Sequence, residues 1–183
     1  MDFDDLPPDQ AIHMEGASVH VVGEWLREVF DESNLAGAWP LTDGPFRIAL
    51  AQSWILLNED LPEVACEDRD ELAEALSKSD QPGHSLWSSF AGWRIIRWRK
   101  VLPEWVTDAE KRGFVSVPSL IGPDLEAVMV APVSGGTHFE ADTELCVQRF
   151  LVRYTPSGLL LAGIGGVLPV PGWPPTETDP LPT

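Results

Sequence analysis

The spacing of apolar residues changes along this chain, and that change limits the fold more than any other feature. Apolar residues recur with helical spacing in the first half, whereas β-branched and alternating residues separated by turn signals follow Gly113. Helices followed by strands predict an α+β fold with an antiparallel sheet. Since 183 residues suffice for one core, we expect a single α+β domain over residues 17–168, an acidic N-terminal arm over residues 1–16 and an extended Pro-rich C-terminal tail over residues 169–183.

Two helices are expected before residue 60. The first lies between Ser18 and Asn34 and places four apolar side chains on one face: Val22, Trp25, Leu26 and Val29. The second begins at residues 42–45, where Thr42 or Asp43 provides a capping side chain and Pro45 fits the first turn, and it continues to Asn58.

The region from residue 67 to residue 105 is less regular. A third helix is expected over residues 67–78, and its few apolar residues place it on the surface. A fourth helical segment opens near Gln81 and runs toward Trp93, after which the period is lost. Residues 93–105 stay unassigned because Pro103 breaks or starts a helix rather than lying within one.

Strands are expected at residues 114–118, 125–133, 143–154 and 159–167, with residues 155–158 as a hairpin turn between the last two. On the third strand, Phe150 and Val152 share one face while Val147 and Leu151 share the other. A strand that is apolar on both faces needs cover on both, from helices on one side and from a partner or loop on the other. This pattern favours a homodimer.

Three or four helices followed by an antiparallel meander resemble the nuclear-transport-factor-2-like fold, whose members include scytalone dehydratase, ketosteroid isomerase and SnoaL-type polyketide cyclases. The resemblance covers Ala17 to Leu168 and rests on the order of the elements. It implies N-terminal helices packed into a curved antiparallel sheet, as a cone-shaped α+β barrel with an apolar pocket, and dimers formed through the sheet. It also implies an acid or base projecting into the cone. Tyr154 is the single tyrosine, and no catalytic pair can be assigned.

The formal net charge of −17 argues against nucleic acid and anionic membranes as partners. The acidic start of the chain lacks the features of a signal or transit peptide, and the longest apolar run, residues 159–168, is too short to cross a bilayer. Cys66 and Cys146 have no disulfide or metal-site spacing, so we expect two separate, buried thiols. The sequence therefore predicts a cytoplasmic protein without a metal or cofactor.

Tryptophan and arginine are concentrated between residues 93 and 105, and these residues with one tail tryptophan are our candidate binding residues: Trp93, Arg94, Arg97, Trp98, Arg99, Trp105 and Trp173. The cations could pair with the chain's own carboxylates at residues 59–74, with an acidic partner surface, or with single-stranded nucleic acid, which the net charge disfavours. Trp173 lies in the Pro-rich segment 168–175, which either anchors in a partner's groove or folds back on its own domain.

Carboxylates two residues apart occur at Asp124 and Glu126, and again at residues 140–144 near His138. Such pairs serve general acid–base catalysis when they are buried, but they also suit a solvated strand edge, which is the favoured interpretation. The sequence thus favours a non-catalytic protein-interaction or accessory module that uses the Trp/Arg segment and the tail. The alternative is a small apolar-molecule binder, or an enzyme of the isomerase, dehydratase or cyclase kind.

Overall fold

The computed structural model describes residues 16–80, 83–132 and 146–180, without the side chains of residues 114–118. The helical segments are α2 (Ala17–Leu26), η2 (Arg27–Asp31), α3 (Leu35–Ala38), η3 (Trp39–Leu41), α4 (Gly44–Leu57), α5 (Pro62–Ala65), α6 (Arg69–Ser77), α7 (Trp87–Val101) and α8 (Glu104–Thr107). The strands are β1 (Arg112–Gly122), β2 (Leu125–Pro132), β3 (Gln148–Thr155), β4 (Gly158–Ile164), β5 (Leu168–Val170) and β6 (Thr176–Thr178). The prediction of an α+β fold with an antiparallel sheet is confirmed.

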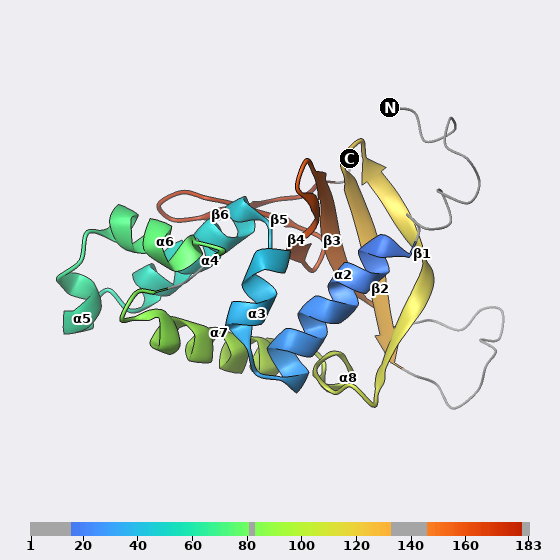
Figure 1. Cartoon of the computed structure of the whole chain (residues 1–183), viewed down its shortest axis with the longest axis horizontal. Helices are drawn as coiled ribbons and strands as arrows, with labels where there is room; N and C mark the ends of the chain where they lie inside the picture. Colours follow the sequence, from blue (N-terminus) through green and yellow to red (C-terminus); the bar gives the residue numbers. More distant parts are fainter. Residues whose placement is uncertain (1–15, 81–82, 133–145, 181–183) are drawn as a thin grey trace.

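Strands β1 to β4 form one antiparallel sheet in sequence order, and β5 pairs with β6 in a separate two-stranded ribbon. Helix α2 lies across one face of the four-stranded sheet, while α4, α6 and α7 extend away from it, with the β5–β6 ribbon running alongside α4 (Figure 1). Among the described residues, no helix has both the length and the apolar composition needed to cross a bilayer.

The first predicted helix is α2 with its π-helical continuation η2. Its four predicted apolar residues, Val22, Trp25, Leu26 and Val29, are completely buried. They pack with sheet residues such as Val128 and Phe150, and the Trp25 and Phe150 rings lie 6.4 Å apart. The apolar stripe thus directs α2 onto the sheet, as the spacing predicts.

The start of α4 joins the helices to the sheet. Thr42 bridges Leu161 of β4, and the Asp43 N–H donates to the Leu161 carbonyl at 2.8 Å. The predicted capping role of the two side chains is wrong: Asp43 is the N-cap residue, but its carboxylate pairs with Arg153 at 2.9 Å. The Thr42 hydroxyl instead accepts from Trp25 Nε1 at 3.0 Å and donates to the Ala38 carbonyl at 2.9 Å.

Packing corrects the expectation for the third helix, and the structure assigns the region that the sequence left open. The apolar residues of α6 are few, but Leu72 and Leu76 are buried and the helix packs against α4, so it is not a purely surface helix. Helix α7 runs without interruption to Val101, and Pro103 is the N-cap residue of α8. Its period is hard to detect because Ile95 enters the core while Ile96 is exposed.

The sheet is apolar on both faces, as predicted. Gly158 has a φ of 121° and closes the predicted turn between β3 and β4, a conformation that glycine adopts without strain. On the face away from α2, Leu151 belongs to a small buried cluster, against which Leu168 of β5 packs. The chain's own C-terminal ribbon therefore provides part of the cover, and the homodimer stays a prediction. Both cysteines are exposed, so the expectation of buried thiols is wrong.

The buried Trp25–Thr42 hydrogen bond makes the first testable prediction. Thr42→Val keeps the shape but leaves the Trp25 N–H without an acceptor, which should lower the free energy of unfolding by about 1–3 kcal/mol. Thr107→Val is the matched control, because the Thr107 hydroxyl bonds only an exposed carbonyl of its own turn. Urea unfolding of both variants measures the difference, and equal effects would contradict a special role for Thr42.

Candidate functional site

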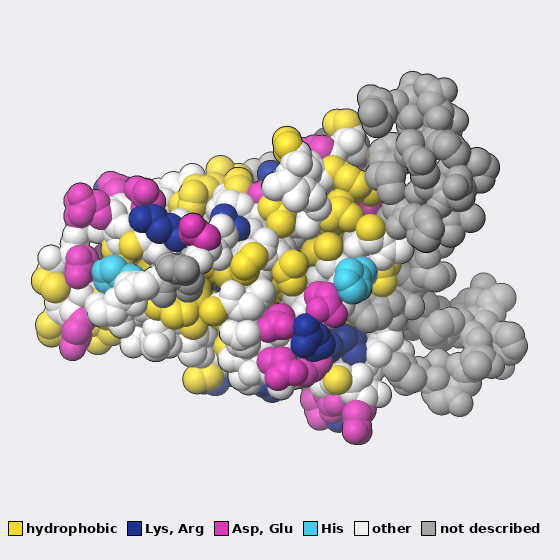
Figure 2. Space-filling model, in the orientation of Figure 1, with side chains coloured by type: hydrophobic (Ala, Val, Ile, Leu, Met, Phe, Trp, Pro, Cys, Tyr) yellow, Lys and Arg dark blue, Asp and Glu magenta, His cyan; other side chains and the backbone are white. Residues whose placement is uncertain are grey.

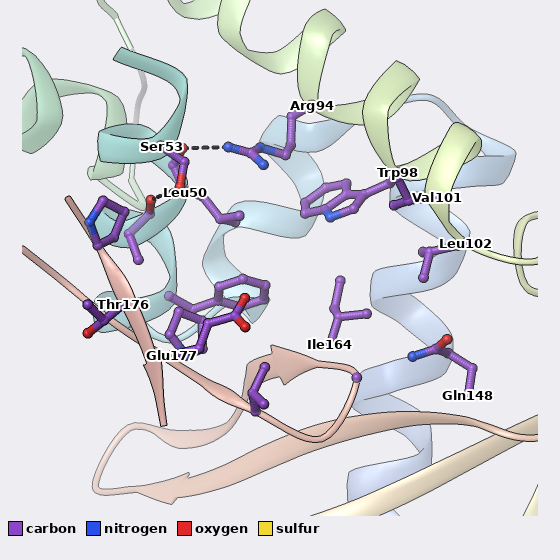
Figure 3. Close-up of a pocket in the computed structure, with 16 residues that line it drawn as sticks. Leu50, Ser53, Arg94, Trp98, Val101, Leu102, Gln148, Ile164, Thr176 and Glu177 are labelled. Atoms are coloured by element: carbon purple, nitrogen blue, oxygen red, sulfur yellow. Dashed lines mark hydrogen bonds between the residues drawn. The ribbon is translucent and has the colours of Figure 1, made fainter. Parts of the chain in front are cut away.

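A pocket of about 350 Å³ lies between α4, α7, the ends of β3 and β4, and the C-terminal ribbon (Figure 3). Its walls are largely apolar and are formed by Phe46, Ala49, Leu50, Trp98, Val101, Leu102, Ile164, Val167, Pro169 and Pro175. Polar side chains reach it from α4, α7, β3 and β6: Ser53, Arg94, Gln148, Thr176 and Glu177. A concave, mostly apolar surface with a few polar groups is the usual character of a small-molecule site.

Arg94 is the unusual member of this set. Only 7% of its surface is exposed, and its Nη2 donates to the Leu50 carbonyl at 2.6 Å. The guanidinium lies over the Trp93 ring at 4.8 Å, and the rings of Phe90 and Trp98 are also within 6 Å. Its Nε has no hydrogen-bond partner in the described part of the chain. The aromatic rings thus hold the cation, but no carboxylate there neutralises it.

The environment of Arg94 disfavours its charge. Burial, and then the positive charge of Arg97, lower the pKa of Arg94 to about 9. The side chain is still a cation at neutral pH. A buried cation without a paired anion is costly, so an anion that entered the pocket would gain an unusually favourable partner.

The ionisable groups of the pocket stand apart. Arg94 and Glu177 are the only ionisable side chains among its described lining residues, and they lie on opposite sides of it in Figure 3. The Ser53 hydroxyl donates a hydrogen bond to the Ala49 carbonyl within α4, at 2.8 Å. The Gln148 amide donates to the Arg149 carbonyl at 3.2 Å, which leaves its oxygen available to another donor.

The C-terminal ribbon forms one wall of the pocket because three contacts hold the connection between its strands. The Gly172 N–H donates to Gln52 Oε1 at 2.9 Å. Trp173 Nε1 donates to Asp70 Oδ1 at 2.7 Å, and the Arg69 guanidinium lies over the Trp173 ring at 4.9 Å. Of the two arrangements expected for this segment, the described residues therefore have the one that folds back on its own domain.

The candidate residues from the sequence do not form one exposed patch. Arg94 and Trp98 line the pocket, and Trp93 stacks on Arg94. Arg97 is exposed on α7, and Arg99 donates to the Phe30 carbonyl at 2.5 Å. The remaining two, Trp105 and Trp173, are partly buried against the core.

The expected ion pairs with residues 59–74 are wrong for Arg94 and Arg99, because within the described residues both bond backbone carbonyls instead. Other cations do pair locally. Figure 2 shows basic side chains among acidic ones near the end of α2, and Arg27, which follows that helix, pairs with Glu24 and Glu28 at 2.8 Å.

Four polar lining residues went unnoticed in the sequence: Ser53, Gln148, Thr176 and Glu177. Each is an ordinary polar residue in its own element and has no motif around it. They are singled out only because they line the same pocket as Arg94, and no local sequence pattern indicates this.

The carboxylates at the start of β2 have different environments. Asp124 is largely exposed, with Arg153 Nε 3.8 Å from its carboxylate. Glu126 is only 6% exposed and accepts a hydrogen bond from the Tyr154 hydroxyl at 2.7 Å. The strand-edge interpretation is therefore wrong for Glu126, which lies on a central strand. Neither Glu126 nor Tyr154 lines the pocket, and residues 140–144 and His138 lie outside the described residues.

Comparison with known protein families, with curated proteins and with solved structures found no match. The resemblance to the nuclear-transport-factor-2-like fold therefore stays a prediction. In residues 16–80, 83–132 and 146–180, no three His, Cys, Asp or Glu side chains are grouped so that they could hold a metal ion.

The Glu126–Tyr154 pair predicts a shifted titration. Burial, and then the hydrogen bond to Glu126, raise the pKa of Tyr154. Since the ordinary value is about 10, the folded protein should show little tyrosinate at that pH. A raised tyrosine pKa stabilises the fold fully below the unfolded value of about 10, and this contribution is lost as pH rises above it.

Because Tyr154 is the only tyrosine, ultraviolet absorbance follows its ionisation directly, and circular dichroism of the same samples follows the fold. Glu126→Gln should move the midpoint toward 10, because the carboxylate charge is removed. A wild-type midpoint near 10 in the folded protein would refute the shift.

Proposed function

We propose that this chain is a non-catalytic binding module for a small, largely apolar molecule that occupies the pocket between α4, α7 and the C-terminal ribbon. The observation that carries this proposal is the pocket itself: about 350 Å³, with apolar walls and a few polar groups. The indole of Trp98 offers a large apolar contact surface to a ligand.

Binding is favoured over catalysis by the separation of the ionisable groups. General acid–base catalysis needs groups within hydrogen-bond reach of the proton that they transfer. Arg94 and Glu177 lie on opposite sides of the pocket (Figure 3), so they are not placed to act on the same proton. Glu126 and Tyr154 are bonded to each other away from the lining.

The resemblance to the nuclear-transport-factor-2-like fold predicts an apolar pocket inside a cone. The proposal keeps an apolar pocket but places it elsewhere. Between α2 and the sheet the core is packed with Trp25, Phe150, Val128 and Val152. The proposed ligand space is therefore the separate pocket lined by α4, α7, the ends of β3 and β4, and the C-terminal ribbon.

Filling the pocket should weaken binding. The uncharged probe 1-octanol should bind the wild-type chain and change its tryptophan fluorescence, because Trp98 lines the pocket. Ser53→Phe places a ring in this space and should weaken that binding at least about tenfold. Fluorescence titration measures both affinities.

Ser89→Phe is the matched control, because Ser89 is exposed on α7 and is not a lining residue. This variant should bind 1-octanol like the wild type. Absence of binding to the wild-type chain, or equal binding to Ser53→Phe, would contradict the proposed function.

A second candidate is self-association through α7. Ile96 and Val101 are each 56% exposed, and the exposed cations Arg97 and Lys100 lie beside Ile96 on this helix. The occupant proposed for this surface is a second copy of the chain: the cations of α7 would pair with carboxylates of the other copy and so offset part of the repulsion between two chains of net charge −17.

Ile96→Asp should weaken such a dimer at least about tenfold, since it removes a buried apolar contact and adds a charge. Leu57→Asp is the control, because Leu57 is 67% exposed at the end of α4. Sedimentation equilibrium measures the association, and a wild-type chain that is monomeric at all concentrations would contradict the dimer.

A further inference from the structure

In the part of the chain that the structure describes, no carboxylate pairs with the cation in the pocket. Arg94 is almost completely buried, one of its nitrogens donates to the Leu50 carbonyl, and its Nε has no acceptor within the described residues. The surrounding rings of Trp93, Phe90 and Trp98 offer no hydrogen-bond acceptor of ordinary strength. A guanidinium has five N–H donors, so most of its donor capacity is left for a ligand.

We infer that the pocket selects monocarboxylates, with the ligand's carboxylate paired to Arg94 and its apolar body lying against Trp98 and Ile164. This inference rests on the proposed binding function and names the class of molecule bound. Arginine suits a carboxylate because its planar fork of N–H groups matches the two oxygens.

The rest of the pocket favours a ligand that carries a single negative charge. Glu177 lies across the pocket from Arg94 (Figure 3), so a second anionic group at the far end of a ligand would meet a carboxylate. Phosphate esters carry close to two charges at neutral pH, whereas one unpaired guanidinium balances only one. The net charge of −17 also repels polyanions. An apolar chain or ring with one carboxylate meets all three conditions.

The test compares three probes of equal chain length on the wild-type protein by calorimetry: octanoate, octanamide and octanedioate. Octanoate should bind roughly ten- to a hundredfold more tightly than octanamide, the range expected for a hydrogen bond to a charged group. Octanedioate should bind more weakly than octanoate because of Glu177.

Equal binding of octanoate and octanamide would overturn the inference while leaving the binding function intact. Octanedioate binding at least as tightly as octanoate would overturn the preference for one charge. If none of the three probes binds, both the inference and the proposed function fail.

Variants of Arg94 test whether this residue causes the preference for octanoate over octanamide. Arg94→Met should remove the difference between octanoate and octanamide, whereas Arg94→Lys, which keeps the charge, should retain part of it. Arg27→Met is the control, because it changes the net charge equally at an exposed position outside the pocket. Full selectivity in a folded Arg94→Met protein would overturn the assignment, and the wild-type comparison decides the ligand class even if this variant does not fold.

Discussion

The arrangement of this protein depends on the contact between the start of α4 and strand β4. Thr42 forms a β-bridge with Leu161, and the Asp43 N–H donates to the Leu161 carbonyl. The side chains of Thr42 and Asp43 bond Trp25 of α2 and Arg153 of β3. Two consecutive residues thus connect two helices to two strands. Because these groups are buried, each hydrogen bond left unmade would carry a desolvation cost, which makes the position of α4 specific. One wall of the pocket follows directly from that position.

The pocket lies between elements whose side chains do not pack completely against one another. Helices α4 and α7 supply facing side chains, and the C-terminal ribbon closes the third side because Gly172 and Trp173 bond residues of α4 and α6. Arg94 enters this space from α7. In an apolar core a lone cation would be unfavourable, and its burial beside an open cavity is the observation behind the proposed anionic ligand.

Much of the secondary structure was predictable because the local pattern and the tertiary packing agree. The stripe that contains Val22 and Trp25 lies on the core face of α2, and residues 155–158 form the expected turn. Prediction of the helix boundaries failed for a helix whose side chains lie in several different environments. Helix α7 buries Ile95 and Trp98 but exposes Ile96, so its apolar residues do not form one clean stripe. Asp43 was misread because a short-range cap and a long-range ion pair use the same side chain.

The sequence by itself determined the fold class, the main helices and strands, and the unusual concentration of tryptophan and arginine in residues 93–105. Only the tertiary structure decided that Arg94 and Trp98 face a pocket while Arg97 faces solvent. The reason is physical: residues of one helix share a local pattern, but burial depends on contacts with distant segments. Arg94 bonds the carbonyl of Leu50, 44 positions away, and Glu177 reaches the same pocket from the C-terminal ribbon. No spacing of residues within one segment indicates that residues so far apart in the sequence line the same pocket.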